Sequence, residues 1–340
     1  MESRVQTVCL VILAAVALGA ALYWLGPVMI PFVLAVFIAL GLDLVVELQV
    51  RRLCMPRGVA RLSTTVIAVL FFAAVWWVLS TSVAQLAESA PVYSMQLQAL
   101  LDRLTEAAPE TLRDEVRAQV AALAEVPVSS IGSLLGRTAA AVLNLLSNAF
   151  LVLIFALFLI LGRGEGRVDG TWATIQGQIQ GYLLAKTLIS AVTGALVGLV
   201  LAVLGVPLAM TFGLLAFLLN FIPSIGSVVA TLLPLPVVIV TPEVSPLAAV
   251  LAIALPGAIQ MVLGNVVEPR LMGRSLDLHP AMILVSLIFW GMLWGVVGMF
   301  LATPITAMAK ILCERFEGSR PVANLMAGRL GAAAPRGRPA

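Results

Sequence analysis

Residues 28–46 read VMIPFVLAVFIALGLDLVV, a run in which Asp43 is the one charged side chain. A spanning helix needs about 20 mostly apolar residues, because hydrocarbon offers the backbone no hydrogen-bond partners. The same composition extends along the chain, of which 61% is hydrophobic and 11% is charged, whereas roughly a quarter of a soluble domain is charged. The sequence therefore predicts an all-α polytopic membrane protein.

Six segments have the length and composition of transmembrane helices. They are residues 8–25, 28–46, 62–84, 139–161, 188–204 and 247–264. The first is longer than the core of a typical signal peptide and is followed by further spans, so we expect an uncleaved anchor. Gly26-Pro27 joins the first two segments without a charge, which suits the turn of a helical hairpin.

Two further apolar stretches, residues 208–240 and 281–309, do not resemble simple spans. The first is interrupted by FIPSIG at 221–226, where proline removes a backbone donor and breaks a helix. The second would place the arginine-rich end of the chain outside if it crossed once. We therefore expect a re-entrant hairpin that turns near residues 290–295, with one long tilted helix as the alternative. Eight or more membrane segments result, and opposed broken helices are typical of alternating-access transporters.

The basic residues set the orientation. Residues 85–138 hold four of the 20 basic residues and seven acids, and the other sixteen basic residues fall in segments that we assign to the cytoplasm. The positive-inside rule then places both termini in the cytoplasm and 85–138 outside the inner membrane. Leucine spacing on both sides of Pro109 predicts that this outer region is a helical hairpin. We divide the chain into the first three helices (1–84), the outer hairpin (85–138), a transport core (139–310) and an Arg-rich tail (311–340).

Two helical faces have a periodic pattern. The first face, typical of a helix lying in the cytoplasmic interface, consists of Trp172, Ile175, Ile179 and Tyr182. The second consists of small residues that let helices approach closely, and it contains Ala191, Gly194, Ala195 and Gly198. We expect the second face to pack against another helix, with lining of a pathway as the alternative.

Polar side chains inside apolar segments are costly, so each is either paired within the bundle or functional. Our candidates for the solute pathway are Asn144, Asn148, Asn220, Pro223, Ser224, Gly226, Gln260 and Asn265. Asn220 and Ser224 flank the predicted helix break, where freed backbone groups can meet a solute. We expect the site between this break and residues 281–309. For the asparagines, hydrogen bonding between helices is the alternative role.

Glu268 and Arg270 flank Pro269 at the foot of a seam formed by Gln260 and Gly264. This position predicts a charged cytoplasmic gate, and a solvated helix end is the alternative. We expect such an exposed pair to contribute under about 1 kcal/mol to folding.

Other site classes receive little support from the residues. His279 is the single histidine, which disfavours a metal site and a hydrolase, and we expect it to mark the start of the second hairpin. The three cysteines predict no disulfide framework. Ala185 precedes Lys186 where a phosphate loop requires glycine, and a net charge of +3 is small for a nucleic-acid partner. We expect no enzyme activity and no cofactor.

The segment EPRLMGRSLDLHP at 268–280, followed by Trp290-Gly291 and Trp294-Gly295, resembles the C-terminal signature of the autoinducer-2 exporter family, the PerM-like permeases. Pro31-Phe32 and residues 222–226 are also similar to that family. The second helix ends GLDLVV at 41–46, where family members have a polar Asn-Pro-like break, so the role of Asp43 is open. The resemblance implies export of autoinducer-2, or sodium or lithium exchange for protons.

These observations favour a permease that exports a small polar solute without hydrolysing ATP and forms a homo-oligomer in the bilayer. The antiporter is second, because Asp43, Glu47 and Glu268 all lie near cytoplasmic ends. A non-transport scaffold is the third hypothesis, and it gives no reason for irregular backbone at membrane depth.

Overall fold

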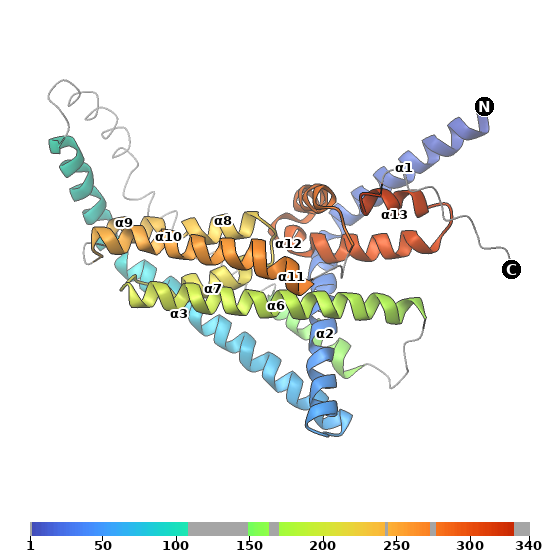
Figure 1. The fold of residues 1–340 in the computed structure, drawn as a ribbon, viewed down its shortest axis with the longest axis horizontal. Coiled ribbons are helices and arrows are strands. Elements are labelled where there is room, and N and C mark those ends of the chain that lie inside the picture. The colour runs from blue at the N-terminus through green and yellow to red at the C-terminus, as the bar shows by residue number, and fades with distance from the viewer. Residues whose placement is uncertain (1, 108–148, 163–169, 242–243, 273–276, 330–340) are drawn as a thin grey trace. The chain divides into compact units, whose positions relative to one another are not determined.

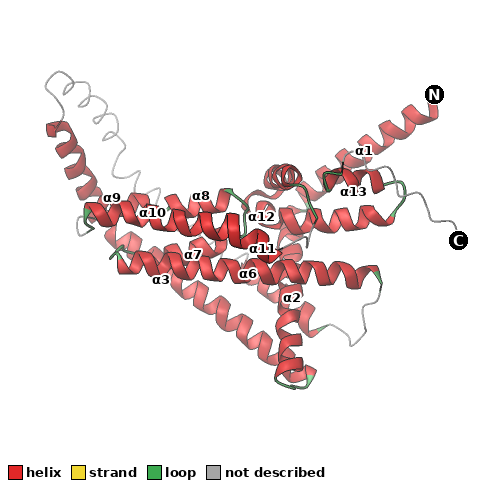
Figure 2. Cartoon of the chain, in the orientation of Figure 1, coloured by secondary structure: helices red, strands yellow, loops and turns green. Residues whose placement is uncertain are grey.

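The computed structural model of the chain describes residues 2–107, 149–162, 170–241, 244–272 and 277–329. Helices make up nearly all of these residues, and no strand occurs among them (Figure 1, Figure 2). The labelled helices are α1 (Glu2–Trp24), α2 (Gly26–Arg52), α3 (Arg57–Ala107), α6 (Thr171–Val203), α7 (Ala209–Leu219), α8 (Ile225–Leu232), α9 (Leu235–Val240), α10 (Pro246–Val262), η1 (Leu263–Val267), α11 (Glu268–Met272), α12 (Pro280–Arg315) and α13 (Arg320–Met326). The predicted all-helical class is confirmed for this part of the chain.

Five helices in the described part of the chain are long and apolar enough to cross a membrane. They are Gly26–Arg52, Arg57–Ser82, Ile175–Val203, Pro246–Leu271 and Pro280–Arg315. The first predicted span coincides with α1, and the fourth is described only as the short apolar helix Ala149–Leu161. The chain is thus a multi-pass membrane protein, while the predicted six spans and two re-entrant hairpins remain a prediction.

The described residues form two compact units. Unit 1 comprises Met1–Thr65, Leu151–Ala185 and Met272–Ala340, and unit 2 comprises Val66–Phe150 and Lys186–Leu271. α3 runs unbroken to Ala107, so the first part of the predicted outer hairpin is helical. The remainder of that hairpin, 108–138, lies outside the described residues, and the four predicted regions remain a prediction.

The core of unit 1 is an apolar cluster on α2, α6 and α12. It contains Phe37, Ile175, Ile179, Trp294, Leu301 and Ile311. The prediction that this face lies in the cytoplasmic membrane interface is therefore wrong. α6 is one helix of 33 residues, and Ile175, Ile179 and Tyr182 are buried in protein. An apolar stripe has the same period whether it faces lipid headgroups or a neighbouring helix, so the sequence pattern did not separate the two.

The second predicted break is present within α12. Gly295 has φ 63° and ψ −143°, which is not helical. A Cβ added to Gly298 would stand 2.7 Å from the carbonyl carbon of Trp290, and one added to Gly291 would stand 2.9 Å from Cγ of Met299. Residues eight apart in a straight helix are separated by about 12 Å. The chain therefore turns back at Gly295, so α12 consists of two arms, and its 36 residues are not the single long tilted helix that was the alternative.

The core of unit 2 depends on a close crossing of α6 and α7. A Cβ on Gly194 would lie 2.6 Å from the carbonyl oxygen of Gly213, and a Cβ on Gly213 would lie 2.9 Å from Cα of Gly198. The predicted packing role is confirmed for Gly194 and Gly198, whereas Ala191 and Ala195 of the same predicted face are exposed. Beside this crossing, Val197, Leu201, Phe212 and other apolar residues form a buried cluster with α8, α9 and α10.

Candidate functional site

A polar stripe along α6 forms the first wall of a cavity in unit 2. Lys186, Ser190 and Thr193 are spaced at i, i+4 and i+7 and so share one helix face. Their exposed fractions are 2%, 0% and 0%. Thr193 donates to the carbonyl of Ile189 on its own helix at 2.8 Å. Buried polar groups need partners, and those of Lys186 and Ser190 come from other helices.

The partner of Ser190 lies at the end of α7. Asn220, which follows the last residue of α7, is 6% exposed, and its Nδ2 donates to Ser190 Oγ at 3.0 Å. This hydrogen bond holds the start of the helix break against α6. The predicted alternative for the asparagines, a hydrogen bond between helices, is therefore present at Asn220, which also lines the cavity.

The chain turns sharply between α7 and α8 at Ser224. This residue has φ 60° and ψ −50°, and Ile225 N donates to Pro223 O at 2.6 Å. The geometry is the rare positive-φ γ-turn, which strains a residue with a side chain by about 1–3 kcal/mol. The predicted break is thus present. Backbone strain of this kind is concentrated at functional sites, so the turn at Ser224 is a candidate part of the functional site.

Gly226 allows the two arms of the break to approach. A Cβ at this position would stand 2.7 Å from the carbonyl carbon of Leu219 and would overlap its oxygen. Because backbone atoms cannot rotate away as a side chain can, only glycine fits this turn. Gly226 does not line the cavity, but it sets the shape of the segment that does.

The turn between α7 and α8 forms the second wall of the cavity. The end of α10 forms the third wall, where the helix widens into the π-helical turn η1. Gln260 is on α10, Gly264 and Asn265 are in η1, and Glu268 begins α11. A π turn closes its hydrogen bonds over five residues instead of four and is frequent at functional sites. All four of these residues line the cavity.

Lys186 finds its partner on this third wall. Its Nζ lies 2.5 Å from Glu268 Oε1, and the two side chains are 2% and 19% exposed. Removing one partner of a buried ion pair destabilises a protein by about 3–5 kcal/mol, because the other charge is left uncompensated. The pair therefore joins α6 to α11 and places two opposite charges at the cavity wall.

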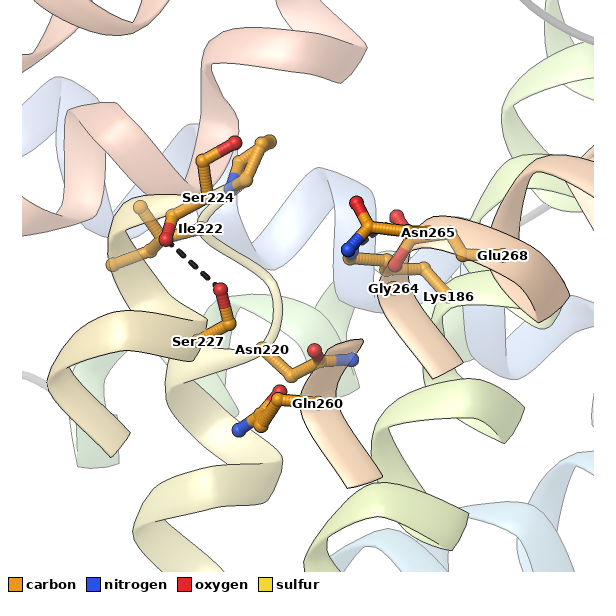
Figure 3. A pocket seen from close by; sticks show the side chains of 10 residues that line it. Lys186, Asn220, Ile222, Ser224, Ser227, Gln260, Gly264, Asn265 and Glu268 are labelled. Atoms are coloured by element: carbon orange, nitrogen blue, oxygen red, sulfur yellow. Dashed lines mark hydrogen bonds and ion pairs between the residues drawn. The ribbon is translucent and has the colours of Figure 1, made fainter. Parts of the chain in front are cut away.

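These elements enclose a cavity of about 150 Å³. It is lined by Lys186, Asn220, Ile222, Pro223, Ser224, Ser227, Gln260, Gly264, Asn265 and Glu268. Figure 3 shows Ser224 and Ser227 on one side, Lys186, Asn265 and Glu268 on the other, and Asn220 and Gln260 below them. A water molecule occupies about 30 Å³ of liquid, so the volume suits several waters or one small solute.

Two hydrogen-bond donors at the cavity have spare capacity. Gln260 is 6% exposed, and its Nε2 has no hydrogen-bond partner among the described residues. An ammonium has three donor hydrogens, and the described chain supplies Lys186 with one acceptor, Glu268. A buried donor left without a partner costs about 1–3 kcal/mol. The cavity is therefore suited to a molecule with acceptor oxygens.

The structure brings together most of the predicted pathway residues. Asn220, Pro223, Ser224, Gln260 and Asn265 all line the cavity. Asn144 and Asn148 lie outside the described residues. The second break, in α12, belongs to unit 1, so its predicted place in the same pathway is not tested.

The structure pairs Glu268, one member of the predicted gate, with Lys186 and not with Arg270. Glu268 contacts Lys186, while Arg270 is exposed and makes no ion pair with any residue in the described ranges. The buried lysine supplies a stronger counter-charge than an exposed arginine, because little water screens it. The gating role of either residue stays a prediction.

Sequence reasoning missed Lys186 and Ser227 as cavity residues. A signal for Lys186 was available, since a lysine inside an apolar helix is expected to be functional or paired. Its i, i+4, i+7 relation to Ser190 and Thr193 marked the buried face. Ser227 lies about one helical turn after Ser224. Its hydroxyl donates to the backbone carbonyl of Ser224 at 2.9 Å.

His279 immediately precedes α12 and caps its start, which is the position predicted for it at the start of the second hairpin. Its Nδ1 accepts from Ala281 N at 3.3 Å, and its backbone N donates to Met326 O at 2.9 Å.

A second buried lysine lies in unit 1. Lys310 is 3% exposed, and its Nζ lies 2.9 Å from Asp277, which also pairs with Arg329. No group of three His, Cys, Asp or Glu side chains among the described residues is placed to hold a metal ion.

Comparison of the sequence with known proteins assigns the chain to a family. The model of the AI-2E family transporter matches residues 10–318, nearly the whole chain. The chain belongs to the AI-2E transporter family. It is 33% identical over 313 residues to the AI-2 transport protein TqsA of Escherichia coli (strain K12), covering 88% of this chain and 89% of that relative. The predicted family is therefore confirmed, and the chain is a membrane transporter.

Shorter similarities to two other bacterial proteins agree with this assignment. YhhT of Escherichia coli (strain K12), named as a candidate transport protein, is 38% identical over 122 residues, which is 36% of this chain and 34% of YhhT. YrrI of Bacillus subtilis (strain 168), named in the same way, is 32% identical over 112 residues, which is 33% of this chain and 31% of YrrI.

Proposed function

We propose that this AI-2E transporter exports a small polar solute of the AI-2 type without hydrolysing ATP, and that the cavity of unit 2 holds the solute. The main support is a polar cavity at a break between apolar helices. Irregular backbone at membrane depth persists where it lines a cavity or is covered by protein. Broken helices also present free amides and carbonyls to a transported molecule.

The donors of the cavity fit a solute that carries several oxygens. Gln260 Nε2 is buried without a partner among the described residues, and it lines the cavity. Asn265 and the hydroxyl of Ser224 add groups that can both donate and accept. The relative TqsA is named for transport of AI-2, and this solute is the first one to test.

The remaining elements of the proposal concern placement. Both termini lie in the cytoplasm, residues 85–138 lie outside, and the membrane is the bacterial inner membrane, as the arginine bias predicts. We also propose a homo-oligomer. Glu268 and Arg270 act near the cytoplasmic end of the pathway, with Glu268 acting through its pair with Lys186.

The test is efflux of AI-2 from liposomes that contain the purified protein. Released AI-2 is quantified by mass spectrometry and divided by the amount of correctly inserted protein. Gln260→Ala should reduce efflux strongly, whereas Gln178→Ala is a matched control, because Gln178 is an exposed glutamine on α6. Efflux that does not exceed that of protein-free liposomes contradicts the proposal.

Sodium or lithium exchange for protons is a second candidate, and one observation favours it. Antiport needs a carboxylate inside the pathway, and Glu268 lies at the cavity wall beside Lys186. The same liposomes, loaded with a pH-sensitive dye and given a sodium pulse, test this candidate. A sodium-dependent change in internal pH without AI-2 efflux would favour the antiporter over the exporter.

A further inference from the structure

We infer that Lys186 determines specificity in this cavity, because its ammonium donates to a carbonyl or ether oxygen of the solute in competition with Glu268. The inference rests on the proposed function and adds a contact that the sequence did not indicate. It also assigns the Lys186–Glu268 pair a role beyond joining two helices.

Lys186 has more donor hydrogens than the described residues have acceptors for it. Three ammonium hydrogens meet one acceptor among the described residues, Glu268 Oε1 at 2.5 Å. The side chain is 2% exposed and lines the cavity, so acceptors for the unused hydrogens come from molecules inside that cavity, which a solute oxygen can replace. A buried ammonium with unused donors attracts any acceptor that can enter the adjoining cavity.

The cavity wall holds a second buried donor besides Lys186. Gln260 Nε2 is a second buried donor without a partner in the described part of the chain, and both residues line the same cavity. A solute oxygen that accepts without donating, such as a carbonyl or an ether, satisfies these groups. A solute that offers only donors leaves them unpaired, and a pocket with unpaired polar groups discriminates strongly against such a molecule.

A bound solute and Glu268 compete for the ammonium of Lys186. A solute oxygen that takes hydrogen bonds from Lys186 weakens the hold of Lys186 on Glu268, which is the first residue of α11. Glu268 is 19% exposed and can gain water when it is released. Solute binding thereby loosens the link between α6 and α11, and reformation of the pair expels the solute.

Two variants separate solute contact from helix joining. The double variant K186M/E268Q removes both charges together, which proteins often tolerate, because no buried charge is left alone. The single variant E268Q keeps the ammonium and removes the charge that competes for it. The initial rate of AI-2 efflux against internal concentration gives KM and the maximal rate, and Q178A is the control.

We expect K186M/E268Q to insert normally and to raise KM by about tenfold to a hundredfold, since a hydrogen bond to a charged group is lost. E268Q should lower KM and also lower the maximal rate, because release then lacks its competitor. A double variant with the KM of the wild type overturns the inference and leaves the pair a structural link. If the double variant fails to insert, E268Q decides, with its efflux rate divided by the amount of inserted protein because this variant is itself less stable, and a raised KM overturns the inference.

The proposed function can fail separately. Wild-type protein without efflux above protein-free liposomes contradicts the transport proposal. Binding of AI-2 to the detergent-solubilised wild type and K186M/E268Q, measured by calorimetry, then tests the inference directly. Weaker binding by the double variant supports it, and equal binding overturns it.

Discussion

Gly226→Ala should pull the α7–α8 turn apart. The added Cβ would stand 2.7 Å from the carbonyl carbon of Leu219, and carbon atoms in contact are normally about 3.5–4.0 Å apart. The backbone must therefore move by roughly 1 Å, and overpacking of this kind costs about 1–3 kcal/mol. The preference of helices for alanine over glycine, about 1 kcal/mol, offsets only part of it.

Thermal unfolding in detergent and AI-2 efflux per inserted molecule measure the two consequences. We expect a net destabilisation of at most about 2 kcal/mol and a loss of efflux, because the strained turn that lines the cavity is displaced. Gly181→Ala on α6 is the control, since a Cβ there meets nothing within 4 Å. Gly226→Ala with the stability and efflux of the wild type would show that the close turn is not required.

Three further predictions use single substitutions. Ser224→Gly should stabilise the protein, because glycine relieves the positive φ, whereas Ser224→Ala keeps the strain and loses the hydroxyl; equal unfolding temperatures would contradict the strained turn. Arg270→Gln should leave stability within about 0.5 kcal/mol of the wild type, because Arg270 is exposed. Glu268→Gln should destabilise the protein by about 3–5 kcal/mol, because it leaves Lys186 without its counter-charge. Thermal unfolding of the two variants measures this difference. Asp277→Asn should loosen the hold on Arg329 and on the preceding helix α13, detected as faster limited proteolysis around Arg329; unchanged cleavage would contradict a role of this ion pair in holding α13.

Local chemistry explains why both breaks could be predicted. Pro223 cannot donate a hydrogen bond within a helix, and residues 221–226 interrupt a stretch too long for one crossing. The break in α12 was predicted from the arginines that follow it, and the structure places it at Gly295. Each signal lies in the segment that breaks or directly beside it.

Contacts between helices were harder to predict. Lys186 and Glu268 are 82 residues apart, and no local pattern states which helices meet. Arg270 is close to Glu268 in sequence, so the sequence groups these two residues in one gate and gives no sign that Glu268 contacts Lys186. The same reason applies to Ile175 and Ile179, whose apolar stripe fits a membrane interface and a protein core equally well. Packing decides between such alternatives, and packing is a property of the whole fold.

Protection of a cavity residue by solute tests the central claim most directly. In protein whose three cysteines are replaced, Ser227→Cys places a thiol at the cavity wall, and Gln178→Cys places one on an exposed face of α6. Binding of AI-2 in the cavity predicts slower labelling of position 227 by a thiol reagent when AI-2 is added, with no change at position 178. Labelling of position 227 at the same rate with saturating AI-2 would contradict the assignment of this cavity as the solute site.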